Sequence, residues 1–406
     1  MADQTFVIVG ASLAGATAAQ TLREEGFGGG IVLIGSEPDR PYERPPLSKD
    51  YLQGGSERED MFVHPEPWYA EHDVDLRLST TVTAIDTDAR EVVSDSGDRV
   101  RYDKLLLTTG STPRQLDVSG AGLDGVHYLR TVQDSERIRA AFGAGAVNVV
   151  VIGAGWIGLE TAAAARNAGL AVTVLENAEL PLLRVLGREI AEVFADLHRE
   201  HDVDLRLGVT VAEILGADGR VQSVRLGNGE DIPADVVLIG VGIAPVTQLA
   251  ADAGLAVDNG IVTDEHLRTA DPNIFAAGDV ANARHPVLGK HIRVEYWANA
   301  QRQGAVAARS MLGQDASDGR PPYFFSDQYD LGMEYNGYVE TGGYDRVVIR
   351  GDRQAREFIA FWVSSGRVLA GMNVNIWDVS DDIEKLVGRA VDLEQLADPD
   401  VPLTAL

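Results

Sequence analysis

The sequence predicts an α/β fold with two similar parallel-sheet domains and a third, α+β domain at the C-terminal end. Three observations support this. A glycine-rich turn follows a short apolar run near residue 10, and the same arrangement returns near residue 153. From Tyr323 onward the apolar residues instead fall into short segments typical of strands.

The second turn, within Val147–Glu176, is the more complete of the two. An apolar run leads into the glycine-rich turn, and an alanine-rich helical stretch and a second apolar run follow, ending at Glu176. Gly153 permits the tight turn, Gly155 lets the backbone approach a pyrophosphate, and Gly158 allows close helix–strand packing. An acid at the position of Glu176 accepts hydrogen bonds from a ribose and repels a 2′-phosphate. We therefore expect NAD(H) rather than NADP(H) here.

The first turn repeats this pattern with one change. The expected elements are an apolar strand, a helical segment and a second strand, at Phe6–Val9, Ala16–Arg23 and Ile31–Ile34. Gly10 and Gly15 hold the outer positions of the turn, and the small Ser12 replaces the middle glycine. A nucleophile elbow is disfavoured because Ala14 stands where its last glycine should be. Two such fingerprints predict two Rossmann-like nucleotide-binding domains.

A proline-rich segment follows the first fingerprint, from Arg40 to Lys49. Its prolines favour an extended loop over a helix or a central strand. Arg44 and Lys49 would suit an anionic or electron-accepting ligand. The alternative is a surface loop with two solvated cations.

Two similar strand–turn pairs, Leu105–Gly110 and Val236–Gly242, mark where the chain leaves and re-enters one nucleotide domain. We therefore predict that one domain is inserted in the other, with boundaries 1–112 and 243–320, 113–242, and 321–406. Arg130, early in the insert, is a candidate phosphate contact. Asp279 ends a short apolar strand and could accept a hydrogen bond from a polyol, and a helix is expected from Glu295 to Leu312.

The third domain is predicted from the pattern after a polar, proline-containing boundary at 314–322. The expected strands are Gly332–Tyr335, Tyr344–Ile349, Phe358–Val363 and Val368–Gly371, and the expected helices are Asp381–Val387 and Leu393–Leu396.

Composition excludes several classes of function. The net charge of −27 argues against nucleic acid or an anionic membrane as a partner. The chain has no cysteine, which excludes disulfides, thiolate catalysis and a cysteine-ligated iron–sulfur cluster. Its eight histidines do not pair with other donors at metal-ligand spacing, so we expect no metal site. No apolar run is long enough to cross a bilayer and no signal sequence is visible, so we expect the protein to remain in the cytoplasm.

Several motifs together resemble those of a known family. They are GASLAG, RPYERPPLSK, LLLTTGS, YLRT, GAGWIGLE, GVGIAP, IFAAGDV and EYWANAQ. In combination they resemble the FAD-dependent, NADH-specific ferredoxin reductases of bacterial heme monooxygenase and ring-hydroxylating dioxygenase systems, the group of putidaredoxin reductase and rhodocoxin reductase. The resemblance runs from about residue 5 to about residue 350. It implies a glutathione reductase-like fold, with the NAD domain inserted in the FAD domain.

The resemblance implies a set of residues for each cofactor. Gly10, Ala14 and Gly15 would hold the FAD pyrophosphate, and either Ser36 or Glu37 would contact the adenosine ribose. The other residues implied at FAD are Arg44, Lys49, Val82, Arg130, Asp279 and Trp297. Those implied at NADH are Gly153, Gly155, Ile157, Gly158, Glu160, Glu176, Arg184 and Gly242.

Lys49 and Glu160 would carry the catalytic roles, with Lys49 beside the flavin and Glu160 pairing with it until the nicotinamide arrives. The electrons would then pass from FAD to a [2Fe–2S] ferredoxin. Alternatives on the same scaffold are a rubredoxin reductase, an NADH oxidase, or an interaction flavoprotein similar to apoptosis-inducing factor. A monomer or weak homodimer is expected.

One position departs from the family. Phe325 precedes Ser326-Asp327-Gln328, where family members usually have tryptophan. Phenylalanine keeps an apolar face but lacks the indole donor. The acceptor surface has no motif of its own. Arg302, Arg309 and Arg320 are its candidate cations.

Overall fold

The computed structural model describes residues 3–406, which divide into two compact units. Unit 1 comprises the chain up to Arg44, Arg58–Thr112 and Ile243–Arg320. Unit 2 comprises Pro45–Glu57, Pro113–Gly242 and Pro321–Leu406. The insertion of one part of the chain in another is evident from these ranges. The three-domain boundaries predicted from the sequence stay a prediction.

Unit 1 is built around a five-stranded parallel sheet in the order β19-β7-β1-β2-β3. The strands are β1 (Thr5–Val9), β2 (Gly30–Ile34), β3 (Val74–Arg77), β7 (Lys104–Leu107) and β19 (Ile274–Ala276). The central strand, β1, is apolar and buried from Phe6 to Val9, as expected for a parallel strand whose two faces are both covered. It ends at Val9, directly before the first glycine-rich turn.

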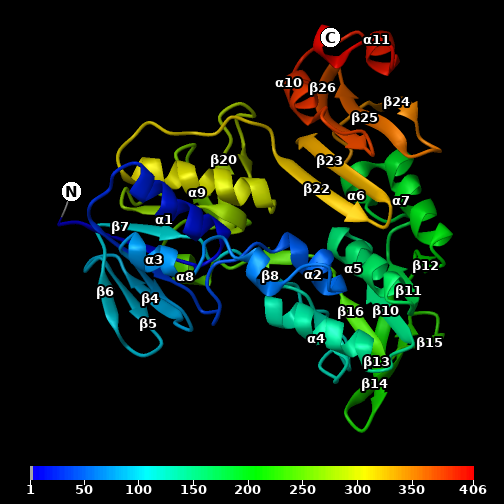
Figure 1. The fold of residues 1–406 in the computed structure, drawn as a ribbon, viewed down its shortest axis with the longest axis horizontal. Coiled ribbons are helices and arrows are strands. Elements are labelled where there is room, and N and C mark those ends of the chain that lie inside the picture. Colours follow the sequence, from blue (N-terminus) through cyan, green and yellow to red (C-terminus); the bar gives the residue numbers. More distant parts are fainter. Residues whose placement is uncertain (1–2) are drawn as a thin grey trace. The chain divides into compact units, whose positions relative to one another are not determined.

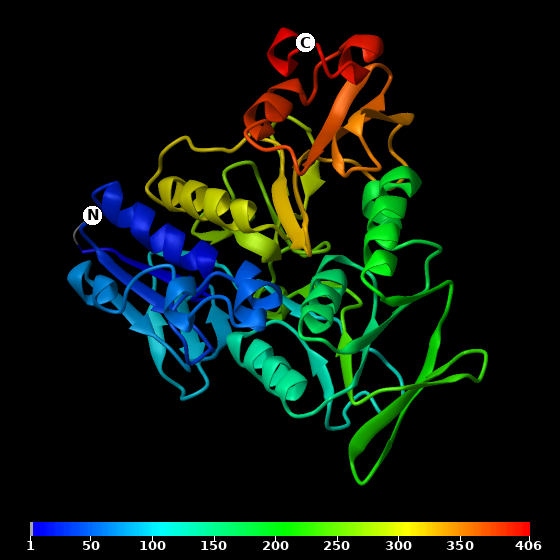
Figure 2. The same cartoon turned by 45° about the vertical axis from the view of Figure 1, so that its right-hand side comes forward.

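Two helices lie side by side on one face of this sheet, α1 (Leu13–Glu24) and α9 (Trp297–Met311) (Figures 1 and 2). They approach closely because both carry small residues at the contact. A Cβ atom on Gly304 would lie only 2.5 Å from the carbonyl oxygen of Ala14. Ala14 is therefore a packing residue as well as a member of the glycine-rich turn.

The rest of unit 1 is made of short elements. A three-stranded antiparallel sheet contains β4 (Val82–Asp86), β5 (Glu91–Ser94) and β6 (Arg99–Arg101). A second small sheet contains β18 (Ile261–Thr263), β20 (Ala281–Arg284) and β21 (His291–Ile292). The remaining elements are α3 (Pro67–Glu71), α8 (Gln248–Asp252), and the 3₁₀ turns Arg58–Met61 and Gly278–Val280. The chain passes between the units at β8 (Ser111–Pro113) and β17 (Ile243–Pro245).

Unit 2 repeats the architecture of unit 1. Its parallel sheet has the order β12-β11-β10-β16-β9, so a central strand is again flanked by the strand that follows its helix. The strands are β9 (Val126–Tyr128), β10 (Asn148–Ile152), β11 (Ala171–Glu176), β12 (Asp204–Leu207) and β16 (Val236–Ile239). An antiparallel sheet again precedes the strand that pairs with the central strand on its other side, here β16. This sheet contains β13 (Val211–Ala217), β14 (Arg220–Leu226) and β15 (Asp231–Pro233), and β13 and β14 form the long hairpin in Figure 2. The helices are α4 (Val132–Gly143), α5 (Trp156–Asn167), α6 (Leu183–Leu186) and α7 (Arg188–Glu200).

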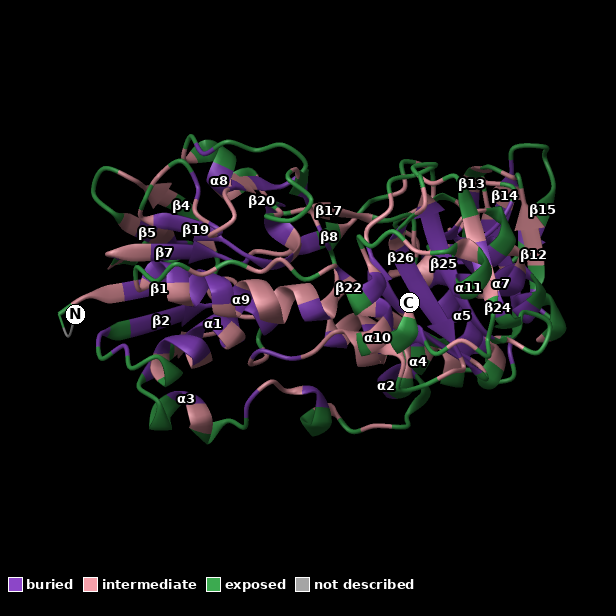
Figure 3. Ribbon diagram, turned by 90° about the horizontal axis from the view of Figure 1, so that it is seen from above, coloured by how far each residue is buried: buried purple, intermediate pink, exposed green. Residues whose placement is uncertain are grey.

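The C-terminal part of unit 2 is an antiparallel sheet in the order β22-β23-β26-β25-β24. Its strands are β22 (Tyr323–Gln328), β23 (Leu331–Gly337), β24 (Arg346–Asp352), β25 (Glu357–Ser364) and β26 (Arg367–Val374). Strands β25 and β26 are buried along most of their length (Figure 3), and α10 (Ser380–Leu386), α11 (Leu393–Ala397) and the 3₁₀ turn Leu403–Ala405 complete the packing. The strands and helices predicted after residue 323 are confirmed within a few residues.

The C-terminal sheet is joined tightly to α6 and α7. The indole of Trp362, which is fully buried, donates to the carbonyl oxygen of Leu186 at 3.0 Å. Gly187 lies between these helices, and a Cβ there would fall 1.9 Å from the hydroxyl of Tyr344. The C-terminal sheet and the second nucleotide-binding sheet therefore form one body.

The proline-rich segment differs from its predicted form. Pro45–Ser48 forms a 3₁₀ turn and Asp50–Gln53 a short helix, α2, so the prediction of an extended loop is wrong beyond Arg44. A proline tolerates the first helical positions because no hydrogen bond from its nitrogen is needed there. The segment belongs to unit 2, where Ser135 donates to the carbonyl oxygen of Leu47 at 2.8 Å and Tyr51 donates to Glu136 at 2.8 Å.

Candidate functional site

The glycine-rich turn of unit 1 is shaped by two positions that exclude a side chain. Gly10 has φ of +120°, and a Cβ atom there would lie 2.1 Å from the carbonyl oxygen of Thr108. A Cβ on Gly15 would lie 2.3 Å from the carbonyl oxygen of Gly10. The N-cap Ser12 makes no side-chain bond to the first turn of α1. The turn thus leaves the N-terminal N–H groups of α1 without a side-chain acceptor at the N-cap.

Glu37 follows β2 and is held by side chains. Its carboxylate accepts from Arg44 at 2.6 Å and from the hydroxyl of Tyr42, and Arg44 also donates to that hydroxyl at 2.9 Å. Ser36 is exposed. The acid at this position is therefore paired with a cation within unit 1.

The other residues predicted at FAD are divided between the units. Val82 begins β4, Asp279 lies in the 3₁₀ turn Gly278–Val280, and Trp297 begins α9, all in unit 1. Burial raises the pKa of Glu43 in this unit, and a hydrogen bond from Trp297 opposes that shift. Arg130 and Lys49 belong to unit 2. Arg130 lies directly before the N-cap of α4, and Lys49 is itself the N-cap of α2.

The turn of unit 2 has the same construction. Gly153 has φ of +101° with its Cβ position 2.4 Å from the carbonyl oxygen of Gly240, and the Cβ position of Gly158 lies 2.0 Å from the carbonyl oxygen of Gly153. Gly155 is different, because no atom lies within 4 Å of its Cβ position. Packing within the protein does not require a glycine at this position. The absence of a side chain instead leaves room for a ligand to approach the backbone.

Glu176 ends β11 beside this turn. One carboxylate oxygen accepts from the backbone N–H of Ala154 at 2.8 Å, and the other accepts from the backbone N–H of Ala178 at 2.8 Å. These donors are neutral, so neither of them compensates a negative charge on the carboxylate. Its position across the turn suits the diol of a ribose.

The remaining residues predicted at NADH are on the surface of unit 2. Ile157 is 45% exposed on the first turn of α5 although it is apolar. Gly242 is exposed with φ of +101°, and its carbonyl oxygen accepts from the backbone N–H of Arg114 at 2.9 Å. Arg184 is exposed on α6.

Lys49 and Glu160 are brought together, as predicted, by three chain segments of unit 2. The Lys49 ammonium lies 3.0 Å from the Glu160 carboxylate, and both side chains are largely buried, at 13% and 3% exposed. Glu160 also accepts from the hydroxyls of Ser48 and Ser326, the latter at 2.7 Å. The buried carboxylate on α5 is therefore held by three donors.

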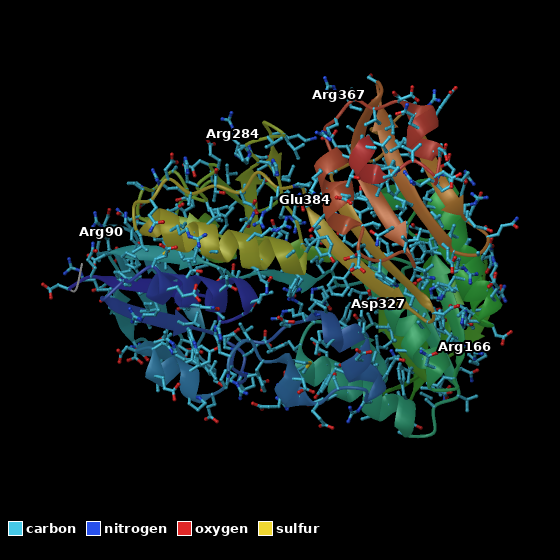
Figure 4. All side chains as sticks on the ribbon, turned by 45° about the horizontal axis from the view of Figure 1, so that its top comes forward. Arg90, Arg166, Arg284, Asp327, Arg367 and Glu384 are labelled. Atoms are coloured by element: carbon cyan, nitrogen blue, oxygen red, sulfur yellow. The ribbon has the colours of Figure 1, made fainter. Side chains whose placement is uncertain are left out.

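Phe325 contacts this cluster from β22. Its ring centroid lies 5.2 Å from the Lys49 ammonium, within the range of a cation–π interaction. Asp327, labelled in Figure 4, lies two residues along the strand. Burial raises the pKa of Asp327, Lys49 lowers it and Glu160 raises it further. Phe325 thus supplies an aromatic face to the lysine, without an indole donor.

The two glycine turns fit dinucleotides. Helix α4 begins with a complete capping box between Thr131 and Asp134, whereas α1 and α5 begin without any side-chain cap. Uncapped helix N-termini that follow glycine turns bind phosphate through their N–H groups and the helix dipole. The turns, the acids and the uncapped helices together suit FAD in unit 1 and NAD(H) in unit 2.

Comparison with known proteins agrees with this geometry. Residues 4–304 match the family model described as pyridine nucleotide-disulphide oxidoreductase, and residues 323–406 match the model described as reductase C-terminal. The chain belongs to the pyridine nucleotide-disulphide oxidoreductase family.

Individual relatives match over nearly the whole length. Rhodocoxin reductase of Rhodococcus erythropolis is 41% identical over 98% of this chain and 93% of its own length. Putidaredoxin reductase CamA of Pseudomonas putida is 38% identical over 99% of this chain and 96% of its own. The reductase chain of a covalent putidaredoxin reductase–putidaredoxin complex superposes with a TM-score of 0.96 at 37% identity, covering 100% of this chain and 98% of that one.

For this oxidoreductase the predicted resemblance, fold class and enzyme class are confirmed, and so is the cofactor pair of FAD and NAD(H). Across residues 3–406 no helix combines the length and the hydropathy that a bilayer crossing requires. The individual site residues stay predictions.

Sequence reasoning missed two residues of the oxidoreductase's cluster, Ser48 and Ser326. Both stand inside motifs that were singled out, directly before Lys49 and directly after Phe325. Nothing in their spacing shows that residues more than 270 positions apart converge on one carboxylate, because that convergence depends on how β22 packs against α5.

Proposed function

We propose that this chain passes electrons from NADH through FAD to a [2Fe–2S] ferredoxin that serves an oxygenase. The observation that carries the proposal is the presence of two dinucleotide turns in a chain without cysteine. In proteins of glutathione reductase type that use a cysteine pair, this pair accepts the electrons within the protein. A chain without one needs a separate electron carrier, and several full-length relatives are named as ferredoxin reductases.

The residues of unit 1 would hold FAD. Gly10, Ala14 and Gly15 would form its pyrophosphate site, Glu37 rather than the exposed Ser36 would meet the ribose, and Asp279 would bind the ribityl chain. When bound, FAD accepts electrons from NADH and releases them to the carrier. Arg44 would act through Glu37, and Val82 and Trp297 would contact the rings. Arg130 of unit 2 is proposed as a further FAD contact.

The residues of unit 2 would select NADH. Gly153, Gly155 and Gly158 would receive the pyrophosphate, with Ile157 and Gly242 along the dinucleotide and Arg184 at its adenosine end. The unpaired charge of Glu176 would accept the ribose diol and repel the 2′-phosphate of NADPH. NADH is therefore proposed as the physiological donor.

Lys49 and Glu160 would supply the electrostatics of electron transfer. A lysine that is largely buried favours negative charge on the group beside it, and Glu160 neutralises that lysine in the resting protein. We expect Lys49→Ala to slow flavin reduction by about tenfold in stopped-flow experiments. Lys385→Ala removes an exposed lysine of α10 and serves as the control. An unchanged rate in Lys49→Ala would remove Lys49 from the mechanism.

The acceptor is tested by steady-state electron transfer to a panel of purified [2Fe–2S] ferredoxins and rubredoxins, with NADH and NADPH compared. Preferential reduction of a ferredoxin supports the proposal. Preferential reduction of a rubredoxin, or rapid consumption of oxygen without a carrier, contradicts it and indicates a rubredoxin reductase or an NADH oxidase. A stable complex with NADH that does not turn over would indicate an interaction flavoprotein.

The cellular setting is proposed from the composition. A net charge of −27 disfavours nucleic acid and anionic membranes as partners. We also propose that the protein is cytoplasmic and works as a monomer or weak homodimer. Arg302, Arg309 and Arg320 are proposed contacts for an acidic carrier.

A further inference from the structure

The Glu160 carboxylate has more support than an ion pair requires. It is 4% exposed and lies on α5, in the turn after Gly158. Besides the Lys49 ammonium it accepts from two hydroxyls, that of Ser48 in the segment 45–57 and that of Ser326 on β22. A carboxylate has about four acceptor sites, so three donors leave it close to saturated.

The hydroxyl of Ser326 is itself held in one direction. Ser326 and Gln328 lie on the same face of β22, and both are 1% exposed. The amide of Gln328 donates to the Ser326 oxygen at 3.2 Å. Because the oxygen accepts this bond, its own hydrogen is left to point toward Glu160.

The chain of donors continues to α7. The side-chain oxygen of Gln328 lies 2.9 Å from Nε2 of His198, a fully buried residue, and Tyr329 lies 3.4 Å from the other ring nitrogen. Burial lowers the pKa of His198 to about 4, and its bond to Gln328 opposes this shift, so the ring is neutral near pH 7. A neutral ring that donates through Nε2 accepts through Nδ1, and every bond from Tyr329 to Glu160 then runs in the same direction.

We propose that Ser48 and Ser326 are positioning residues. They keep the Glu160 carboxylate charged and fixed when the Lys49 ammonium leaves it during the reaction. A buried carboxylate that loses its only cation is left uncompensated, which is costly. Two charge-assisted bonds from hydroxyls reduce that cost, so the lysine is free to leave without displacing the carboxylate. The inference rests on the proposed role of Lys49 and Glu160.

The first test is kinetic, on the FAD-loaded protein. We expect Ser326→Ala to slow flavin reduction by about tenfold at saturating NADH, with little change in the NADH concentration that gives half the maximal rate. Ser326→Thr keeps the hydroxyl and should restore most of the rate. Ser380→Ala removes a hydroxyl that accepts from Asn336 elsewhere in unit 2 and should behave as the unchanged protein.

The second test does not depend on turnover. The melting temperatures of Lys49→Ala, Ser326→Ala and the double variant are compared, all with FAD bound. Since the double variant leaves Glu160 with Ser48 alone, its melting temperature should fall by more than the sum of the two single shifts. The pair Lys49→Ala and Ser48→Ala provides the same comparison if Ser326→Ala does not fold.

The two failures are distinguishable. Additive melting shifts together with an unchanged flavin reduction rate in Ser326→Ala would overturn the positioning role. A rate that is unchanged in Lys49→Ala, with non-additive melting shifts, would overturn the proposed function of Lys49 while the hydroxyl support of Glu160 stands. A slow Ser326→Ala that threonine does not rescue would also overturn the inference, because a lost hydroxyl would not then explain the effect.

Discussion

The two nucleotide turns share their backbone but differ in the acid beside them. In each, a glycine with positive φ lies against a carbonyl oxygen that follows the neighbouring strand, of Thr108 in unit 1 and of Gly240 in unit 2. In unit 1 the carboxylate of Glu37 is paired with Arg44. In unit 2 the carboxylate of Glu176 accepts from the backbone N–H groups of Ala154 and Ala178, and no cation within residues 3–406 pairs with it.

We propose that this difference distinguishes a site that binds its nucleotide from a site that also selects between NADH and NADPH. An acid that is neutralised by arginine can bind a ribose but presents little repulsion to a further phosphate. The charge of an acid bonded by neutral groups is not compensated by a cation, so we propose that Glu176 discriminates against NADPH. The repeated topology thus gives two similar nucleotide sites. The residues that contact the carboxylate in each site would determine whether it distinguishes NADH from NADPH.

The largest expected effect comes from the backbone that the two turns share. Gly10→Ala would place a methyl group 2.1 Å from a carbonyl oxygen at φ of +120°. We expect a loss of about 3 kcal/mol or more in the free energy of unfolding, with loss of FAD on purification. The melting temperature and the flavin content measure this.

Gly28→Ala is the matched control for that variant, because no atom lies within 4 Å of the Cβ position of Gly28 and its φ is not positive. It should retain FAD and melt as the unchanged protein does. If Gly10→Ala also retained its flavin and its stability, the close approach at the turn would not be needed.

The next effect tests the difference between the acids. Glu176→Gln removes the charge that opposes the 2′-phosphate, so the ratio of kcat/KM for NADH over NADPH should fall by about tenfold or more. Glu37→Gln should leave that ratio as it is and weaken FAD binding instead. Steady-state kinetics with both nucleotides measures this ratio. An equal effect of the two substitutions on it would show that Glu37 and Glu176 do not differ in nucleotide selection.

The smallest effect is expected at Gly155. Because its Cβ position has no neighbour within 4 Å, Gly155→Ala should not change the melting temperature measurably. A methyl group there would meet only the pyrophosphate, so KM for NADH should rise a few-fold. A lower melting temperature with unchanged KM would show that packing, and not the ligand, requires this glycine.

Much of the fold follows from local sequence. The apolar runs Phe6–Val9 and Val147–Ile152 predict parallel strands, the glycines predict the turns, and the short apolar segments after Tyr323 predict the C-terminal sheet. The assignment of Pro45–Glu57 to unit 2 was missed, because it depends on bonds such as that from Ser135 to Leu47 between segments far apart in the sequence. Local propensity carries no information on such a contact.

The candidate site divides in the same way. The pairing of Lys49 with Glu160 was implied by the family resemblance and is present at 3.0 Å. The pairing of Glu37 with Arg44 and the two hydroxyls that donate to Glu160 were not predicted, since they depend on which side chains meet after folding. These contacts, more than the motifs, set what the site can do.

The most direct test of the account is the anaerobic reaction of the FAD-loaded protein with NADH and, separately, NADPH, followed by the flavin absorbance. The account predicts that NADH bleaches the flavin rapidly and that NADPH does so much more slowly. A flavin that stays oxidised with NADH, or that is reduced equally fast by both nucleotides, would contradict it.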